Sequence, residues 1–378
     1  MDSFKGSLTT FQAGEAVANG IRRTYPDAEI TVRPLADGGE GTMEAVIHAT
    51  QGTIYEVNAL GPLGEPRLCR YGFIPKTNTA IIEICQAAGI TLVTDKEKNP
   101  LHTTTYGVGQ MIKNAIERGI RKFIIGLGGS ATNDGGVGML QALGFEFLDE
   151  EGEQIPFGAK GLEKLVYIRT ENALPELKEC EVLVACDVKN PLCGVSGCSA
   201  VYGPQKGATA EMIKKMDEWL KNYALLSKRV NKDADENTEG VGAAGGLGFA
   251  FTSYLNARLQ SGIELVMQAT DLENFVQNAD IVVTGEGRLD GQSCMGKAPV
   301  GIARMAKKFG KPVIALSGCV SMDARFCNKH GIDAFFPIVK GACSLQEAMK
   351  VENATDNLAD TTEQVFRLIK TFSILKEN

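Results

Sequence analysis

The order of apolar and polar positions predicts alternating strands and helices in the last third of the chain. Short apolar runs there are typical of buried strands, and amphipathic stretches between them are typical of helices. The expected order is strand 280–284, helix 297–309, strand 312–317, a further helix and strand 333–338. Repeated strand–helix units of this kind predict parallel strands.

The first two thirds are less regular, because consecutive strands precede the first long helix. The expected elements are helix 8–24, strand 29–35, a helix ending near 50, strands 53–60, 67–74 and 79–84, helix 102–119, strand 122–127, helix 138–143, strand 181–187, helix 209–229 and a polar surface loop at 231–239. The fold class is therefore α/β, with a Rossmann/flavodoxin-like parallel-sheet domain and a second α/β domain inserted in it. The expected boundaries are 1–60 plus 278–378 for the first domain and 61–277 for the inserted one, with a ligand cleft between them.

Composition excludes several classes of function. The net charge of −7 and the lack of Lys/Arg runs argue against a nucleic-acid surface. No apolar stretch approaches the ~20 residues of a membrane span, and the start MDSFKGSLTT is not a signal peptide. Ten Cys without a C-x-x-C pair and three His without ligand spacing argue against a zinc site or a histidine triad. A cytoplasmic enzyme that binds a small molecule is expected.

Glycine and polar side chains follow five of the predicted strands. The turns are 36–42 (ADGGEGT), 128–136 (GGSATNDGG), 187–192 (DVKNPL), 285–290 (GEGRLD) and 317–318 (SG). Any one of them could be a capped turn. Because ligands bind beyond the carboxyl ends of parallel strands, five such turns together predict a polar crevice that handles anions.

Three glycine motifs permit other interpretations. Residues 126–131 fit G-x-G-x-x-A, with Glu146 about 20 positions on, but the loop continues to 136 before a helix can begin. Residues 240–245 fit G-x-G-x-x-G without a preceding strand. Residues 291–297 fit G-x4-G-K, but Ala298 replaces the Ser/Thr of a P-loop and the strand is expected to end at 284. An NAD-dependent hydroxy-acid dehydrogenase therefore stays an alternative, and Lys297 stays a candidate phosphate ligand.

Phosphoryl transfer needs cations and backbone N–H donors around the phosphates, carboxylates for Mg²⁺ and a carboxylate base for the acceptor hydroxyl. The loops contain four candidate cations, which are Lys5, Lys206, Arg288 and Lys297. They also contain seven candidate carboxylates, which are Asp2, Asp37, Glu40, Asp134, Asp187, Glu286 and Asp290. The alternative for each single residue is an ordinary surface ion pair.

Seven segments together resemble the type I glycerate kinase family. They are 2–8 (DSFKGSL), 36–42 (ADGGEGT), 128–136 (GGSATNDGG), Asp187 with 190–192 (NPL), 203–208 (GPQKGA), 242–248 (GAAGGLG), and 284–287 (TGEG) with Asp290. The resemblance covers nearly the whole chain in the right order. It implies ATP-dependent phosphorylation of D-glycerate, with Mg²⁺, to 2-phosphoglycerate or 3-phosphoglycerate.

One departure from the family pattern concerns the first residues. Members usually begin with a short apolar strand and Ala-Pro before the 2–8 segment, whereas Met1 directly precedes Asp2 here. The first strand of the sheet is therefore expected to be missing, which would leave Asp2 and Lys5 on an untethered terminus. A non-catalytic glycerate-binding sensor stays a second alternative for this reason.

The expected roles are hypotheses built on these segments. Lys5 and Arg288 hold the carboxylate of glycerate, and Asp187 or Asp290 orients or deprotonates the attacking hydroxyl. The expected metal ligands are Asp37, Glu40 and Glu286. The expected ATP contacts are Gly128, Gly129, Ser130, Asn133, Asp134, Gly245, Gly246 and Lys297, with Lys206 offsetting charge in the transition state. The expected partners are small molecules, and the sequence leaves a homodimer open.

Overall fold

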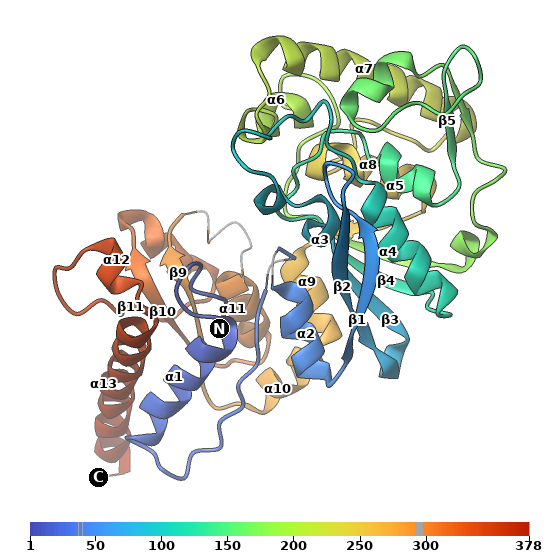
Figure 1. The fold of residues 1–378 in the computed structure, drawn as a ribbon. Coiled ribbons are helices and arrows are strands. Elements are labelled where there is room, and N and C mark those ends of the chain that lie inside the picture. Colours follow the sequence, from blue (N-terminus) through green and yellow to red (C-terminus); the bar gives the residue numbers. More distant parts are fainter. Residues whose placement is uncertain (37, 40, 292, 294–297, 378) are drawn as a thin grey trace. The chain divides into compact units, whose positions relative to one another are not determined.

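The chain forms two compact units (Figure 1). The computed structural model describes residues 1–36, 38–39, 41–291, 293 and 298–377. The terminal unit combines Met1–Asp37 with Val266–Asn378, and the central unit is Gly38–Leu265. These boundaries differ from the expected 60 and 278. Residues 42–60 join the central unit because β1 (Thr53–Leu60) pairs with β2 (Pro66–Ile74) along its whole length.

A six-stranded sheet of order β1-β2-β3-β4-β7-β8 organises the central unit. The other four strands are β3 (Thr79–Glu83), β4 (Lys122–Gly126), β7 (Glu181–Ala185) and β8 (Arg258–Gln260). β1, β2 and β3 are antiparallel neighbours, whereas β3, β4, β7 and β8 run parallel. Every residue of β3 is buried, as its continuous apolar run predicts for a strand covered on both faces. The parallel strands therefore end at one common edge.

Helices and short turns complete the central unit. They are α2 (Thr42–Thr50), α3 (Cys85–Ala88), α4 (Tyr106–Glu117), α5 (Val137–Ala142), α6 (Cys198–Tyr202), α7 (Ala210–Val230), α8 (Ala243–Tyr254), the start of α9 (Gly262–Ala269), the 3₁₀ turns η1 (Pro75–Thr77), η2 (Ile90–Leu92), η3 (Ala159–Lys164), η4 (Pro175–Glu179) and η5 (Pro204–Lys206), and the small hairpin of β5 (Glu146–Leu148) and β6 (Tyr167–Arg169). Thr209 caps α7, since its hydroxyl accepts the Met212 N–H. Among all described helices, none combines the length and the apolarity that crossing a membrane requires.

The terminal unit is built on a parallel sheet of order β11-β10-β9. Its elements are α1 (Thr10–Arg22), α10 (Leu272–Asn278), β9 (Val282–Leu289), α11 (Ala298–Lys308), β10 (Val313–Val320), the 3₁₀ segment η7 (Met322–His330), β11 (Ala334–Pro337), α12 (Leu345–Ala348) and α13 (Val351–Glu377). α1 lies beside α13, so the two ends of the chain pack against each other (Figure 1). Val17, Leu358 and Phe366 belong to their shared apolar core, and Arg23 forms ion pairs with Asp360 and Glu363.

The predicted strand 29–35 is wrong, and so is the prediction of an untethered terminus. Residues 29–35 lie in no strand. The segment is bound to Met1 instead, because the Leu35 N–H donates to the Met1 carbonyl at 3.0 Å. The N–H of Asp2 then donates to the carbonyl of Gly285 in β9 at 2.9 Å. A single residue offers too few donors and acceptors to make a ladder, but these bonds tie the 2–8 segment to β9.

β9 is longer than predicted. Arg288 and Leu289 still pair with Cys319 and Val320 of β10, so the strand ends at 289 and not at 284. Glu286 and Arg288 consequently lie inside a strand rather than in the loop that follows it.

Candidate functional site

Four segments that are far apart in sequence meet at the carboxyl edge of the central sheet. β3, β4 and β7 end side by side at Glu83, Gly126 and Ala185. The 127–136 loop follows β4, and the turn that begins near Asp187 follows β7. As the contacts below show, the glycines of segments 38–41 and 242–246 pack against these two turns. The fold thereby gathers several of the motifs that the sequence singled out.

Glycines allow residues 38 and 39 to lie directly on the strand ends. A Cβ atom added at Gly126 would lie 2.5 Å from the carbonyl oxygen of Gly38, and one at Gly128 would lie 2.7 Å from the Cα of Gly39. Gly38 has φ +87°, and a Cβ there would lie 2.5 Å from the Cβ of Ala185. Side chains at these positions would push the segment off the sheet edge.

Asp134 organises the 127–136 loop from within. Its Oδ2 accepts the backbone N–H of Thr105 at 2.9 Å and the hydroxyl of Thr105 at 2.8 Å. The N–H groups of Gly136 and Gly138, at the start of α5, also donate to this carboxylate. Burial raises the pKa of Asp134 above the usual value, and these hydrogen bonds oppose the shift. Four donors occupy the carboxylate, so Asp134 shapes the loop.

Lys206 lies behind the same loop with its charge buried. Its side chain is almost fully covered, and Nζ donates to the carbonyl of Thr132 at 2.6 Å. Burial lowers the pKa of Lys206 to about 8. The amide nitrogen of Asn133 donates to Ser199 Oγ at 2.8 Å, so the loop is braced by the 198–206 segment.

The 243–246 segment adds a run of left-handed backbone. Ala244, Gly245 and Gly246 have φ values of 52°, 70° and 94° at the point where α8 begins. The carbonyl of Gly245 accepts the N–H of Gly135 at 3.0 Å, and a Cβ at Gly245 would lie 2.1 Å from the Thr132 carbonyl oxygen. The two glycine loops therefore interlock, and Gly245 permits this close approach.

Some buried polar atoms in the motifs lack a hydrogen-bond partner among the described residues. They are Ser7 Oγ, Thr42 Oγ1, Asn133 Oδ1 and Thr284 Oγ1. Each belongs to a different one of the seven segments. A buried polar atom without a partner costs free energy, and such atoms concentrate where a site is built for function rather than for stability.

The terminal unit brings two more segments together at the ends of β9 and β10. A Cβ added at Gly287 would lie 3.4 Å from the Cα of Phe4, so the 2–8 segment crosses β9 there. Glu286 is buried and accepts the hydroxyl of Ser293 at 2.5 Å. Exposed Arg288 lies 3.4 Å from Asp290, through Nε and Oδ2.

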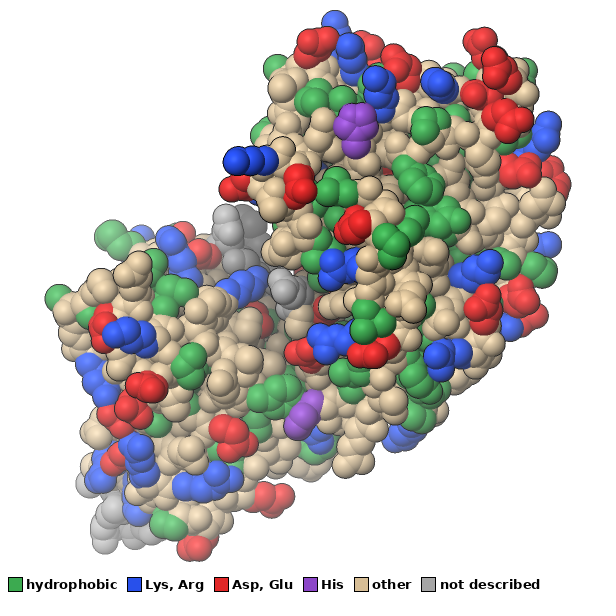
Figure 2. All heavy atoms as spheres, viewed as in Figure 1, with side chains coloured by type: hydrophobic (Ala, Val, Ile, Leu, Met, Phe, Trp, Pro, Cys, Tyr) green, Lys and Arg blue, Asp and Glu red, His purple; other side chains and the backbone are tan. Residues whose placement is uncertain are grey.

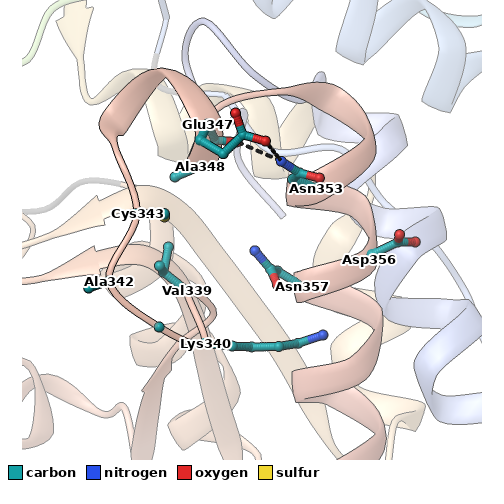
Figure 3. Close-up of a pocket in the computed structure, with 10 residues that line it drawn as sticks. Val339, Lys340, Ala342, Cys343, Glu347, Ala348, Asn353, Asp356 and Asn357 are labelled. Carbon is teal, nitrogen blue, oxygen red and sulfur yellow. Dashed lines mark hydrogen bonds between the residues drawn. The ribbon is translucent and has the colours of Figure 1, made fainter.

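A depression of about 370 Å³ follows β11 in the terminal unit (Figure 3). Loop residues 339–343 and one side of α13 line it, and the amide of Asn357 faces it. Its cation, Lys340, is already paired with Asp360, and Asn353 is bonded to Glu347. This lining carries charges of both signs and contains none of the residues that the sequence singled out for a site.

Charged side chains of both signs interleave on the face shown in Figure 2. Together with the net charge of −7, this mixture gives that face no extended basic patch of the kind that binds nucleic acid.

The predicted site residues divide between the two units. The central unit holds Gly128, Gly129, Ser130, Asn133, Asp134, Asp187, Lys206, Gly245 and Gly246, and the terminal unit holds Lys5, Glu286, Arg288 and Asp290. Asp187 is exposed, and its Oδ1 accepts the N–H of Gly262 at the start of α9. Asp37, Glu40 and Lys297 lie outside the described residues.

Sequence reasoning missed Glu83, Thr105 and Ser199. Glu83 ends a buried apolar strand, TAIIE, just as Asp187 follows one, so the same rule of a carboxylate at a strand end could have found it. Thr105 and Ser199 act through hydrogen bonds to residues 29 and 66 positions away, and nothing local in the sequence signals such contacts.

Comparison with known proteins points to one family. The model of the glycerate kinase family matches residues 1–370. A Haemophilus influenzae protein named glycerate kinase is 45% identical over 368 residues, which are 97% of each chain. The Escherichia coli K12 glycerate 2-kinase is 43% identical over 364 residues, covering 96% of this chain and 95% of the relative. A crystal structure from Salmonella typhimurium LT2, provisionally assigned as glycerate kinase 2, superposes with a TM-score of 0.90 at 43% identity and covers 98% of this chain and 97% of its own.

Proposed function

Since the chain belongs to the glycerate kinase family, we propose that it transfers the γ-phosphoryl group of ATP to a hydroxyl group of D-glycerate. The observation that carries this proposal is the agreement along the whole chain with relatives named for that activity. Glycine loops and polar side chains at the carboxyl edges of two parallel sheets supply the kind of surface that the reaction needs. The similarity to these relatives supports neither a dehydrogenase nor a non-catalytic sensor.

The central unit is proposed to bind the phosphates of ATP. Backbone N–H groups of loops 127–136 and 242–246 would donate to the phosphate oxygens, and Asn133 would hold the first loop in place through its hydrogen bond to Ser199. Lys206 would add positive charge from behind the loop rather than from the surface, since its ammonium group is enclosed. Asp134 acts here as a brace, because its oxygens already accept four hydrogen bonds.

Mg²⁺ is proposed to be held by carboxylates among Glu286, Asp37 and Glu40. Carboxylate oxygens suit this hard cation, which usually takes only one or two of them and completes its shell with phosphate oxygens and water. Of these three carboxylates the structure describes Glu286, which is buried. When bound, Mg²⁺ would neutralise charge on the transferring phosphoryl group.

The terminal unit is proposed to bind glycerate. The exposed side chains of Lys5 and Arg288 would pair with the carboxylate of the substrate. Asp187 or Asp290 would orient the attacking hydroxyl group or accept its proton.

The product is proposed to be 2-phosphoglycerate, which the printed name of the Escherichia coli relative supports. Incubation with D-glycerate, ATP and Mg²⁺, followed by ³¹P–¹H correlation NMR, identifies the phosphorylated carbon. Coupling of phosphorus to the proton on C2 is expected. Coupling to the C3 protons would instead show that the product is 3-phosphoglycerate. Reduction of NAD⁺ by glycerate, or tight glycerate binding without turnover, would overturn the kinase proposal.

A further inference from the structure

Glu83 is a buried carboxylate at the edge of the central sheet where the motif loops meet. It is the last residue of β3, and only 3% of its surface is exposed. Burying a carboxylate is unfavourable unless hydrogen bonds compensate it. Its position beside Gly126, the end of β4, places this group next to the start of the 127–136 loop.

The carboxylate accepts a hydrogen bond from the beginning of α2, which lies 40 positions earlier in the sequence. Oε1 of Glu83 accepts the backbone N–H of Met43 at 2.8 Å. Met43 lies in the first turn of α2, where the N-cap residue Gly41 has φ 90° and no side chain to cap the helix. Glu83 therefore supplies the side-chain acceptor that the start of this helix otherwise lacks.

The segment that enters α2 is held on three strand ends at once. Gly38 and Gly39 lie against Gly126, Gly128 and Ala185 through the close approaches described above. The bond from Glu83 fixes the other end of this short segment at Met43. Segment 36–42 also carries Asp37 and Glu40, two of the carboxylates proposed for Mg²⁺.

We propose that Glu83 is a positioning residue of the phosphotransferase: by anchoring the start of α2, it holds Gly38 and Gly39 in place against the strand ends and the 127–136 loop. The effect on kcat that we expect from this role rests on the proposed function. This role includes no contact of Glu83 with ATP or glycerate, and it needs the acceptor oxygen of the side chain rather than its charge.

Two substitutions at Glu83 separate anchoring from charge. Glu83→Gln keeps an oxygen that can accept the Met43 N–H, whereas Glu83→Ala removes it. Because misplacement of a catalytic segment by 1 Å can cost about 10²-fold, Glu83→Ala is expected to lower kcat by roughly 10- to 100-fold. Glu83→Gln is expected to stay within about threefold of the wild type, since a neutral acceptor retains most of a hydrogen bond.

A matched pair at Asp333 controls for general loss of stability. Asp333 also accepts a backbone N–H, that of Val313 in β10 at 2.6 Å, and it pairs with Lys307, at the amino-terminal edge of the other sheet. Asp333→Ala and Asp333→Asn are expected to leave kcat within about twofold, although Asp333→Ala also removes a native hydrogen bond.

Hydrogen exchange measures the anchor without any reference to activity. Faster exchange at residues 41–45 is expected in Glu83→Ala and not in Glu83→Gln, with the rest of the central sheet unchanged. Unaltered exchange there, or equal kinetic loss in both Glu83 variants, would overturn the assignment. A wild-type protein that does not phosphorylate glycerate would refute the proposed function, whereas the exchange result would still decide whether Glu83 anchors α2.

Discussion

Lys206 has its ammonium group enclosed behind the 127–136 loop, and this burial links folding to pH. Its pKa is about 8 in the folded chain, against an ordinary value of 10.5. The unfolded chain therefore binds more protons between these two values, and stability should rise as the pH increases from 8 to 10.5. Below pH 8 the full cost of burying the charge is present.

Replacing Lys206 by Met should remove this contribution to the pH dependence. The difference in unfolding free energy between the wild type and Lys206→Met is expected to change by about 3 kcal/mol between pH 8 and pH 10.5, in favour of the wild type at high pH. Urea denaturation of both proteins at several pH values measures the difference. Parallel stability curves would show that the ammonium group has a normal pKa.

The two candidate bases can be separated by isosteric substitution. Asp290 lies beside Arg288 and accepts the Ser293 N–H, whereas Asp187 accepts the N–H of Gly262. The one that accepts the proton of the substrate should lose about 10²–10⁴-fold in kcat when changed to Asn. Steady-state kinetics with glycerate and ATP give the result for each variant. Losses below tenfold at both positions would assign proton transfer to neither.

At the level of elements, the interlocked glycine loops depend on Gly245. The residue has φ +70°, and a Cβ would meet the carbonyl of Thr132 at 2.1 Å. Gly245→Ala should cost more than the ~1–2 kcal/mol of left-handed backbone alone, because the two loops must move apart. A rise in the KM for ATP should accompany the loss of stability.

Gly152→Ala is the control for that prediction. Gly152 has φ +81° in the same unit, with nothing within 4 Å of the added Cβ. It should show only the backbone cost of ~1 kcal/mol and unchanged kinetics. Thermal denaturation and ATP titrations of both variants provide the comparison, and equal effects would mean that the close contact at Gly245 has no special role.

Local patterns in the sequence were sufficient to predict most of the longer helices and strands. Strand 53–60 was predicted with the bounds of β1, and the expected helix 209–229 is one residue away from α7 at each end. The strand at 29–35 failed because a strand exists only with a partner strand, and the backbone bonds of Arg33 and Leu35 reach the single residue Met1. Motif residues were predictable from glycines and acids at strand ends. The bonds that join motifs, such as Glu83 to Met43, depend on segments that only the folded sheet brings together.

On the scale of the whole molecule, the two ligands should protect different parts of the chain. ADP with Mg²⁺ is expected to slow hydrogen exchange in the central unit, at 127–136 and 242–246. Glycerate is expected to slow it in the terminal unit, at 2–8 and 284–290, because bound ligands stabilise the regions that contact them. Mass spectrometry of peptides from each complex measures this. If both ligands protected the same unit and neither protected the other, the assignment of ATP to the central unit and glycerate to the terminal unit would be refuted.

The terminal unit joins Met1–Asp37 to Val266–Asn378, and this has a consequence during synthesis. α1 leaves the ribosome well before its partner α13 is synthesised. At roughly 5–20 residues per second, the ~330 residues between Arg22 and Val351 delay their meeting by about 15–65 s. The central unit is continuous and can fold during this interval. The apolar side chains of α1, Val17 and Ile21 among them, meanwhile stay uncovered and are natural targets for chaperones in the cell.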